Sequence, residues 1–146
     1  MQARHLTKKE SKILAADREA VGLLLRECGI ETGLTQSVAD LPSLQSLLRE
    51  PLCDSRGSST LASLGTAFGD VLASHIGLDW VMVTDKLGSD HALQLPGRHI
   101  FVFPRSMLLK RIGRGERPDG IDLVFMLGEI SHAVEAQAAG AARGDA

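Results

Sequence analysis

The sequence predicts an α+β domain in which a three-stranded antiparallel meander packs against helices and an N-terminal helical pair closes one side. Three short β-type segments within residues 79–103 are separated by turn-forming residues, and the flanking segments carry apolar residues at helical spacing. The connections between these strands are too short for a crossover, so neighbouring strands must run antiparallel. A sheet of this size needs a helix on at least one face to be stable, so we expect the flanking helices to pack against it.

Composition limits the functions that are open to the chain. The 146 residues suffice for one domain whose core needs no disulfide or metal. Aromatic residues make up only 3%, which argues against a stacking platform for single-stranded nucleic acid. The net charge of −2 gives no overall attraction for nucleic acid or an anionic membrane. The polar N-terminus does not resemble a secretory signal and no stretch approaches a membrane-spanning length, so we expect a cytoplasmic protein.

The helical pair is predicted for residues 1–50. Thr7 and Glu10 have the spacing of a capping box, which begins a first helix that Gly29 ends. A second helix follows and ends at Glu50, because the residue before a proline is pushed out of helical geometry.

A linker rich in turn formers joins this pair to a core predicted for residues 58–137, within one domain that spans residues 1–137. The two cysteines, Cys28 and Cys53, lie in unrelated contexts, and we expect two free thiols in a reducing compartment. Residues 138–146 carry no core-forming side chain and are expected to be a disordered tail.

A stripe of small residues marks the helix predicted for residues 58–76. Gly65 and Gly69 lie four positions apart in it, although a glycine inside a helix costs about 1 kcal/mol relative to alanine. Their presence predicts close packing against another backbone, and the sheet is the expected neighbour. This helix is therefore expected to be the centre of the domain.

The strands are predicted at residues 79–84, 90–95 and 99–103. Gly88 supplies positive-φ freedom for the first turn, and Pro96-Gly97 makes the second. The third strand lacks polar alternation, which predicts that both of its faces are covered.

Two helices are predicted after the strands. Pro104 begins the first, which ends near Ile112, and the second runs from about Ile121 to Gln137. Because apolar residues cover much of its circumference, the second helix is expected to be well buried. One of its stripes consists of Ile121, Val124, Phe125, Gly128 and His132, and the other of Leu123, Leu127, Ile130 and Val134.

Three motifs carry a resemblance to a known family. They read LGTAFGDVL at residues 64–72, GLDWVMVTDKLGSDHAL at 77–93 and FPRSMLLKRIGRGE at 103–116. Residues 64–116 thereby resemble a bacterial family classed as domain of unknown function 3806. The resemblance implies a bacterial intracellular protein with an α+β fold, and it implies no activity, cofactor or catalytic residue.

Two histidines offer one candidate for chemistry. His91 and His99 lie on adjacent predicted strands, and with Asp79 or Asp90 they could bind a metal ion or act in a small hydrolase. The chain has no HxxH or HExxH pattern and no Cys/His pair at ligand spacing. A metal site at His91 and His99 therefore stays an alternative, and for His75 and His132, which fall on apolar helix faces, we prefer a hydrogen-bonded role in the core or at its rim.

Three other polar positions have structural interpretations. Asp85 and Asp90 flank a glycine-containing turn that lacks the acidic density and the terminal glutamate of a calcium loop. Ser106 lies at a strand-to-helix junction, but without the glycines of a nucleophile elbow. We interpret the aspartates as turn-stabilising residues and the serine as an N-cap or first-turn residue of the helix.

One local cluster of positive charge follows the third strand. Its members, predicted to project outward, are Arg105, Lys110, Arg111 and Arg114. A solvated helix face is the structural interpretation, and docking of an acidic protein partner is the functional one. Nucleic-acid binding through the basic residues of 105–117 is a weaker alternative, because overall positive charge and aromatic residues are lacking.

The sequence therefore predicts a non-catalytic binding module that contacts a protein partner through these basic residues, with no cofactor and no membrane. A homodimer is one form that such a module could take. The alternative from another class is a small hydrolase or metal-dependent enzyme that uses His91 and His99.

Overall fold

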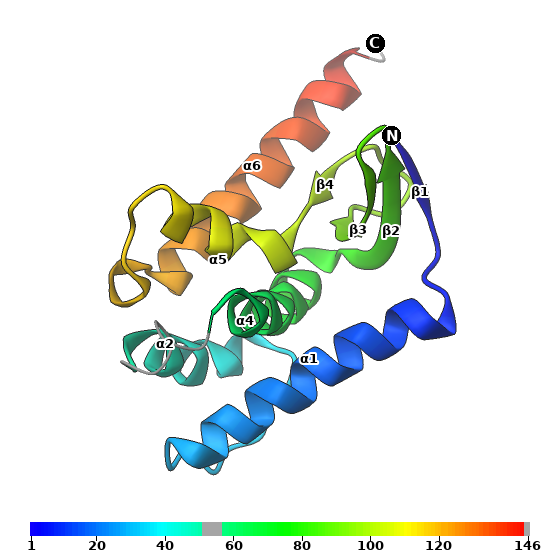
Figure 1. The fold of residues 1–146 in the computed structure, drawn as a ribbon. Helices are drawn as coiled ribbons and strands as arrows, with labels where there is room; N and C mark the ends of the chain where they lie inside the picture. Colours follow the sequence, from blue (N-terminus) through cyan, green and yellow to red (C-terminus); the bar gives the residue numbers. More distant parts are fainter. Residues whose placement is uncertain (51–56, 145–146) are drawn as a thin grey trace.

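A small antiparallel sheet occupies one side of the molecule and helices fill the other (Figure 1). The computed structural model describes residues 1–50 and 57–144, with side chains up to residue 140. The elements in chain order are β1 (Gln2–Arg4), α1 (Lys8–Glu27), α2 (Leu41–Arg49), α4 (Ser58–Leu72), β2 (Asp79–Asp85), β3 (Gly88–Gln94), β4 (Phe101–Val102), α5 (Pro104–Gly113) and α6 (Leu123–Gly144). The predicted α+β class is confirmed. Most of the predicted linker, and Cys53 with it, lies outside the described residues.

The sheet has four strands in the order β1-β2-β3-β4, with every neighbouring pair antiparallel. The prediction of three strands was wrong, because β1 is a further strand on the outer edge of β2. Three exposed residues form β1, and its first residue, Gln2, pairs with Thr84. Such a strand is held by backbone pairing with β2 and has no apolar alternation by which a sequence pattern could reveal it.

The hairpin between β2 and β3 follows the predicted turn closely. Asp85 pairs with Gly88, which leaves two residues in the loop, and Gly88 has a φ of 133°. β4 is shorter than predicted: only Phe101 and Val102 pair with β3, although the prediction ran from 99 to 103. A second, small apolar cluster of Val81, Val83 and Ala92, with Phe101 and Phe103 packed against it, lies apart from the main core.

Helix α4 crosses the middle of the molecule, with α1, α2 and α5 in contact with it (Figure 1). A Cβ atom on Gly65 would overlap the carbonyl oxygen of Pro104, and one on Gly69 would lie 2.7 Å from the ring of Trp80. The predicted close approach of another backbone is therefore confirmed at Gly65, whereas the close neighbours of Gly69 are side-chain atoms. The neighbour differs in part from the expected sheet, because Gly65 lies against the first turn of α5 and only Gly69 meets a strand residue. The helix ends at Leu72 and passes into a π-helical turn, Ala73–Gly77.

The predicted capping box at the start of α1 is confirmed. The Glu10 amide donates to Thr7 Oγ1 over 3.2 Å, and the Thr7 amide donates to Glu10 Oε1 over 2.9 Å. Arg4 donates to both oxygens of the same carboxylate, at 2.7 and 2.9 Å, which ties β1 to the helix. These hydrogen bonds, that from Arg4 first, lower the pKa of Glu10 to about 2.

Helix α6 differs most from its prediction. Leu123, Met126, Leu127 and Val134 are buried, but Val124 is 65% exposed and Phe125 is 63% exposed. The expectation that both apolar stripes are buried was wrong, since the core takes up only one side of the helix. The helix also continues past Gln137, its predicted end, to Gly144.

Gln45 of α2 fixes the start of α6. Its side-chain amide donates to the Ile121 carbonyl over 2.7 Å, and its Oε1 accepts from the Leu123 amide over 2.9 Å. One side chain thus pairs two backbone groups at the entry to the helix, where intrahelical partners are lacking.

Candidate functional site

The four basic residues that the sequence places in one cluster lie in three environments. Arg105 turns into the molecule and pairs with Asp17 of α1. Arg111 faces α6 and lies 3.3 Å from Glu116 and 3.8 Å from Glu129. Lys110 in the last turn of α5 and Arg114, the residue that follows the helix, are exposed. The outward projection predicted for Arg105 was wrong, because a buried carboxylate lies within its reach.

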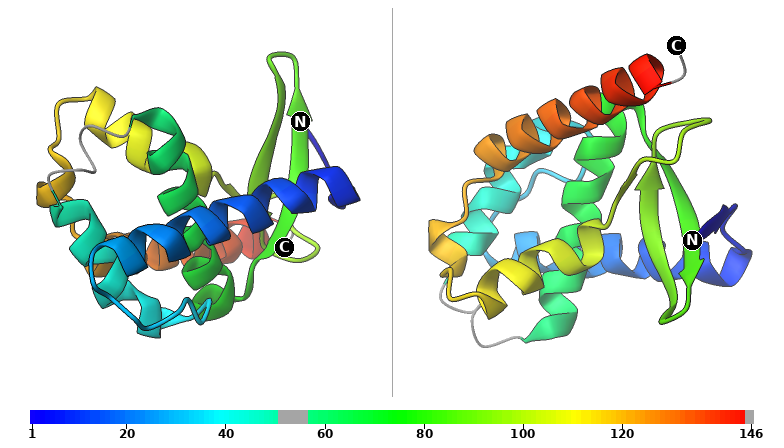
Figure 2. Two further views of the ribbon diagram at one scale, coloured as in Figure 1. Left: turned by 60° about the horizontal axis from the view of Figure 1, so that its bottom comes forward. Right: turned by 90° about the horizontal axis from the view of Figure 1, so that it is seen from above.

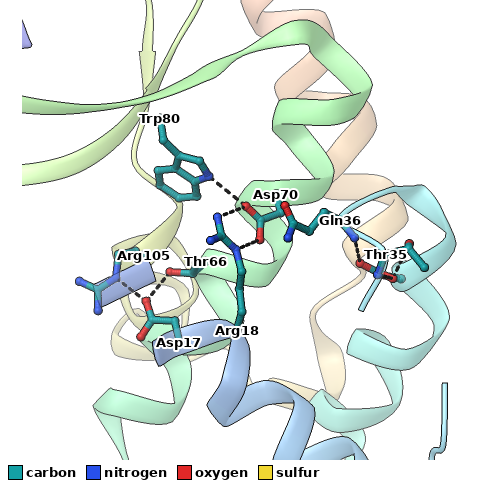
Figure 3. A network of polar contacts seen from close by, with 9 residues as sticks. Asp17, Arg18, Thr35, Gln36, Thr66, Asp70, Trp80 and Arg105 are labelled. Carbon is teal, nitrogen blue, oxygen red and sulfur yellow. Dashed lines mark hydrogen bonds and ion pairs between the residues drawn. The ribbon is translucent and has the colours of Figure 1, made fainter. Parts of the chain in front are cut away.

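Asp17 is the centre of a polar contact between three helices (Figure 3). It is 8% exposed and accepts hydrogen bonds from Ser63 Oγ at 3.1 Å, Thr66 Oγ1 at 2.6 Å and Arg105 Nε at 2.9 Å. The carboxylate therefore connects α1 with α4 and with the first turn of α5. A buried carboxylate is tolerated when charged and polar donors satisfy it in this way.

A second buried carboxylate, Asp70 of α4, lies close to the first (Figure 3). Arg18 of α1 donates to both of its oxygens, from Nε at 2.7 Å and Nη2 at 2.9 Å. The indole Nε1 of Trp80 on β2 donates to the same carboxylate over 3.0 Å. The hydrogen bonds to Asp70 raise the pKa of Arg18, which keeps this guanidinium charged.

Sequence reasoning missed these two carboxylates, although a signal for Asp17 was present. Asp17 lies three residues after Leu14 and four before Val21, on the apolar stripe of α1. A carboxylate on a core stripe indicates a buried donor elsewhere in the chain. In the described part of the chain every buried side-chain polar atom has a hydrogen-bond partner, so the fold accounts for both carboxylates.

The two histidines considered for catalysis have separate surroundings. His91 is 5% exposed, and its Nε2 donates to the Glu10 carbonyl of α1 over 2.9 Å. His99 is exposed and packs edge-on against Phe101, with ring centroids 4.9 Å apart. Their surroundings thus differ, one ring being held against a helix and the other lying on the surface. Among residues 1–50 and 57–144, no three His, Cys, Asp or Glu side chains are grouped so as to hold a metal ion.

The other polar candidates make short-range contacts. Asp85 Oδ1 accepts from the Leu87 amide over 2.8 Å, which stabilises the hairpin turn as expected of an aspartate there. Ser106 lies in the first turn of α5, and its hydroxyl lies 3.5 Å from the Phe103 carbonyl. Asp90 is exposed on β3.

A pocket of about 420 Å³ lies between the hairpin and α5. Its apolar lining includes Val83, Phe103 and Met1, and Lys110 of α5 also lines it. Asp85 and Asp90 line the side that the hairpin contributes. The pocket is therefore bounded on one side by Lys110, a member of the predicted basic cluster, and on the other by the exposed end of β3.

A second concave feature lies on the outer side of α6, and sequence reasoning missed it. A shallow groove of about 430 Å³ is lined by Val124, Phe125, Gly128, Glu129 and His132. All of these residues except Glu129 belong to one of the two stripes that were expected to be buried, so the pattern was present and only its surroundings were misjudged.

In the described part of the chain, none of the helices combines the length and the apolar character that crossing a bilayer requires.

Comparison with protein families matches residues 40–123 to a family described as "Domain of unknown function (DUF3806)". Comparison with curated proteins gives no match. Among solved structures, a 1.50 Å crystal structure of a protein from Bacteroides thetaiotaomicron VPI-5482 is similar, with a TM-score of 0.70 and 13% identity. The similarity covers 84% of this chain and 46% of that one, so this chain spans less than half of that protein's length. At this identity the likeness shows a shared fold alone.

Proposed function

The chain belongs to the DUF3806 family, and we propose that it is a non-catalytic interaction module of the bacterial cytoplasm that binds an acidic, extended segment of a partner protein. The proposed site, here called the hairpin site, consists of the pocket between β3 and α5 together with Lys110 and Arg114. One observation carries the proposal: the exposed Lys110 lines a pocket with an apolar wall, the exposed Arg114 follows four residues later, and no ion pair satisfies either cation among the described residues.

The open edge of β3 supports an extended ligand. β4 pairs only with Leu93 and Gln94, and the N-terminal half of β3, Gly88 to Asp90, is exposed. In an antiparallel hairpin, alternate residues direct their backbone N–H and C=O groups away from the partner strand. Such groups can pair with an added strand, whose alternate side chains then enter a neighbouring pocket.

The charges around the pocket decide where an acidic side chain would fit. Asp85 and Asp90 line the hairpin side, and Asp85 already accepts the Leu87 amide. A ligand carboxylate therefore belongs on the side of α5, near Lys110, while an apolar side chain of the ligand fits against Val83 and Phe103. Because both cations are exposed, salt should weaken the contact strongly.

The test uses a labelled peptide with alternating Glu and Leu residues, measured by fluorescence anisotropy at low and moderate salt. The variant Lys110→Glu with Arg114→Glu should weaken binding by about tenfold or more, since each reversed charge turns an attraction into a repulsion. Lys12→Glu is the matched control, because Lys12 is exposed on α1 at the start of the chain and should leave binding unchanged.

Three results would contradict the proposal. One is the absence of peptide binding at low salt, and another is equal binding by the double variant. The third is tighter binding of the peptide in which Lys replaces Glu. A single-stranded or duplex oligonucleotide that binds better than the acidic peptide would favour nucleic-acid recognition instead.

A further inference from the structure

Strand β3 is paired along its whole length on one side and over only two residues on the other. It pairs with β2 from end to end, whereas β4 pairs with Leu93 and Gln94 alone. The tip of the β2–β3 hairpin projects beyond the helices in both views of Figure 2, and Leu87 at this tip is 97% exposed. The pocket of the hairpin site borders the part of β3 that β4 leaves open.

A proline ends the pairing of β4. Val102 lies opposite Leu93, and two residues further along this register Pro104 would lie opposite His91. Pro104 has no amide hydrogen to donate to a neighbouring strand, and it begins α5 instead. β4 therefore stops at a point where β3 still continues toward the hairpin tip.

Alternation along β3 decides which backbone groups face the open edge. The amide of Leu95, the residue after β3, donates toward β4, to the Ile100 carbonyl over 3.1 Å. Every second residue of an antiparallel strand faces the same neighbour, so His91 and Ser89 direct their N–H and C=O groups to this edge. The register places His91 level with the start of α5, so Ser89, which lines the pocket, is the residue left for a ligand. Among the described residues, no backbone group forms a hydrogen bond with Ser89 on this side.

We infer that the partner segment adds to this edge as a strand antiparallel to β3, in line with β4, and that it reads apolar–any residue–acidic from its N-terminus. This inference rests on the proposed function of the hairpin site, and it names the direction and the sequence pattern of the ligand. The central residue of the triplet lies opposite Ser89 and exchanges both backbone hydrogen bonds with it. An antiparallel strand continues a sheet in which every neighbouring pair is already antiparallel.

The outer two side chains of the triplet enter the pocket, because directly opposite residues share a face of the sheet and both Asp90 and Gly88 line the pocket. The first lies opposite Asp90, where a carboxylate would meet a like charge, and it follows Phe103 in the line of β4. An apolar side chain is therefore favoured there. The third lies opposite Gly88, which has no side chain, so a glutamate has room to reach toward Lys110.

Two peptides of identical composition test the direction of the strand. One carries Leu-Thr-Glu and the other Glu-Thr-Leu, each between the same Gly-Ser flanks, and fluorescence anisotropy at low salt measures their binding. The first should bind about fivefold more tightly or better, because an antiparallel strand brings the glutamate of the second opposite Asp90. Asp90→Asn should reduce this preference by removing the like charge. The first should also bind more tightly than the alternating Glu–Leu peptide, whose Leu and Glu side chains lie on opposite faces of the strand.

Methylation of the peptide nitrogens tests the pairing with Ser89. N-methylation of the central threonine removes the hydrogen that the Ser89 carbonyl would accept, and it should weaken binding about fivefold or more. N-methylation of the glutamate is the matched control with a smaller effect, because its N–H faces away from β3.

A pair of protein variants tests the same contact from the other side. Ser89→Pro removes the N–H that faces the open edge, where a strand tolerates proline, and it should weaken binding about fivefold or more. Ser89→Ala is its control, because it removes only the hydroxyl that lies 2.9 Å from Thr84 Oγ1. Trp80 fluorescence verifies that each variant is folded.

The outcomes separate this inference from the proposed function. If none of the three peptides binds, the hairpin site and the inference fail together. If Lys110→Glu with Arg114→Glu weakens binding but Glu-Thr-Leu binds as tightly as Leu-Thr-Glu or more tightly, the hairpin site stands and the direction is wrong. Stronger weakening by methylation of the glutamate nitrogen than of the threonine nitrogen would likewise overturn the inference alone.

Discussion

Replacing Arg105 by alanine tests whether this residue stabilises the fold or serves as a surface cation. Its guanidinium Nε lies 2.9 Å from the carboxylate of Asp17, which is buried, and the arginine side chain itself is only 25% exposed. Removing it leaves the Asp17 carboxylate buried with two hydrogen-bond donors, the hydroxyl groups of Ser63 and Thr66, where it had three. We therefore expect a loss of stability and no role for Arg105 in the hairpin site.

The size of this loss follows from the surroundings of the pair. Breaking a fully buried ion pair by removing one partner costs about 3–5 kcal/mol. Here the arginine is one-quarter exposed, and Ser63 and Thr66 still donate to Asp17, so part of the penalty is avoided. A hydrogen bond to a charged group contributes about 1.5–3 kcal/mol, and we expect Arg105→Ala to lower the free energy of unfolding by about 2 kcal/mol.

Urea unfolding followed by the fluorescence of Trp80 measures this change. Trp80 is the one tryptophan of the chain, and its indole donates to Asp70, so its emission reports on the contact between β2 and α4. A double-mutant cycle with Asp17→Asn separates the pairwise interaction from general damage. The two substitutions should couple by about 1 kcal/mol or more, because the neutral amide no longer needs a cation.

Arg114→Ala is the control, since Arg114 is an exposed arginine at the end of the same helix. It should change the free energy of unfolding by less than about 0.5 kcal/mol. Two results would contradict this role of Arg105. One is a loss in the free energy of unfolding for Arg105→Ala that is as small as that of Arg114→Ala, and the other is an effect that simply adds to that of Asp17→Asn.

Two further predictions concern the core and the chain start. Gly65→Ala should destabilise the fold by about 2 kcal/mol or more, because its Cβ would overlap the backbone of Pro104. Gly22→Ala should stabilise α1 by about 0.5–1 kcal/mol, because a Cβ there would have nothing within 4 Å. Urea unfolding that finds Gly65→Ala more stable than Gly22→Ala would contradict this account of the packing. The pKa of Glu10 falls from its ordinary 4.5 to about 2 on folding, so the stability that its carboxylate contributes is complete above pH 4.5 and is lost as the pH falls toward 2. Glu10→Gln should therefore flatten the acid limb of the stability–pH profile, and a parallel shift of the whole profile would contradict this explanation.

Local signals in the sequence predicted the elements well where neighbouring residues determine the structure. The capping box of Thr7 and Glu10 starts α1, and Gly88 sits at the positive φ that the hairpin requires. Pro104 begins α5, as its preset φ favours. These features depend on a few adjacent residues, so the physical cause and the sequence signal coincide. The family assignment also followed from local motifs, since the match over residues 40–123 contains them.

The candidate site was predictable only in part. Lys110 and Arg114 lie exposed as expected, but a helical wheel could not show that Arg105 meets Asp17, a residue far away in the chain. The pocket beside Lys110 depends on how the hairpin and α5 approach each other, and no spacing within either element encodes that distance.

The sequence by itself determined the main helices, the β2–β3 hairpin and which residues are apolar on each face, although it missed β1 and misplaced the ends of β4 and α6. Only the tertiary structure decided what lies against those faces. The stripe that holds Val124 and Phe125 has the same apolar pattern as the stripe that holds Leu127 and Val134, yet one is exposed and the other is buried. The reason is that the burial of a helix side depends on which other elements pack against it, whereas the spacing of its apolar residues depends on the geometry of the helix alone. In the same way β1 exists only because the edge of β2 offers it backbone hydrogen bonds.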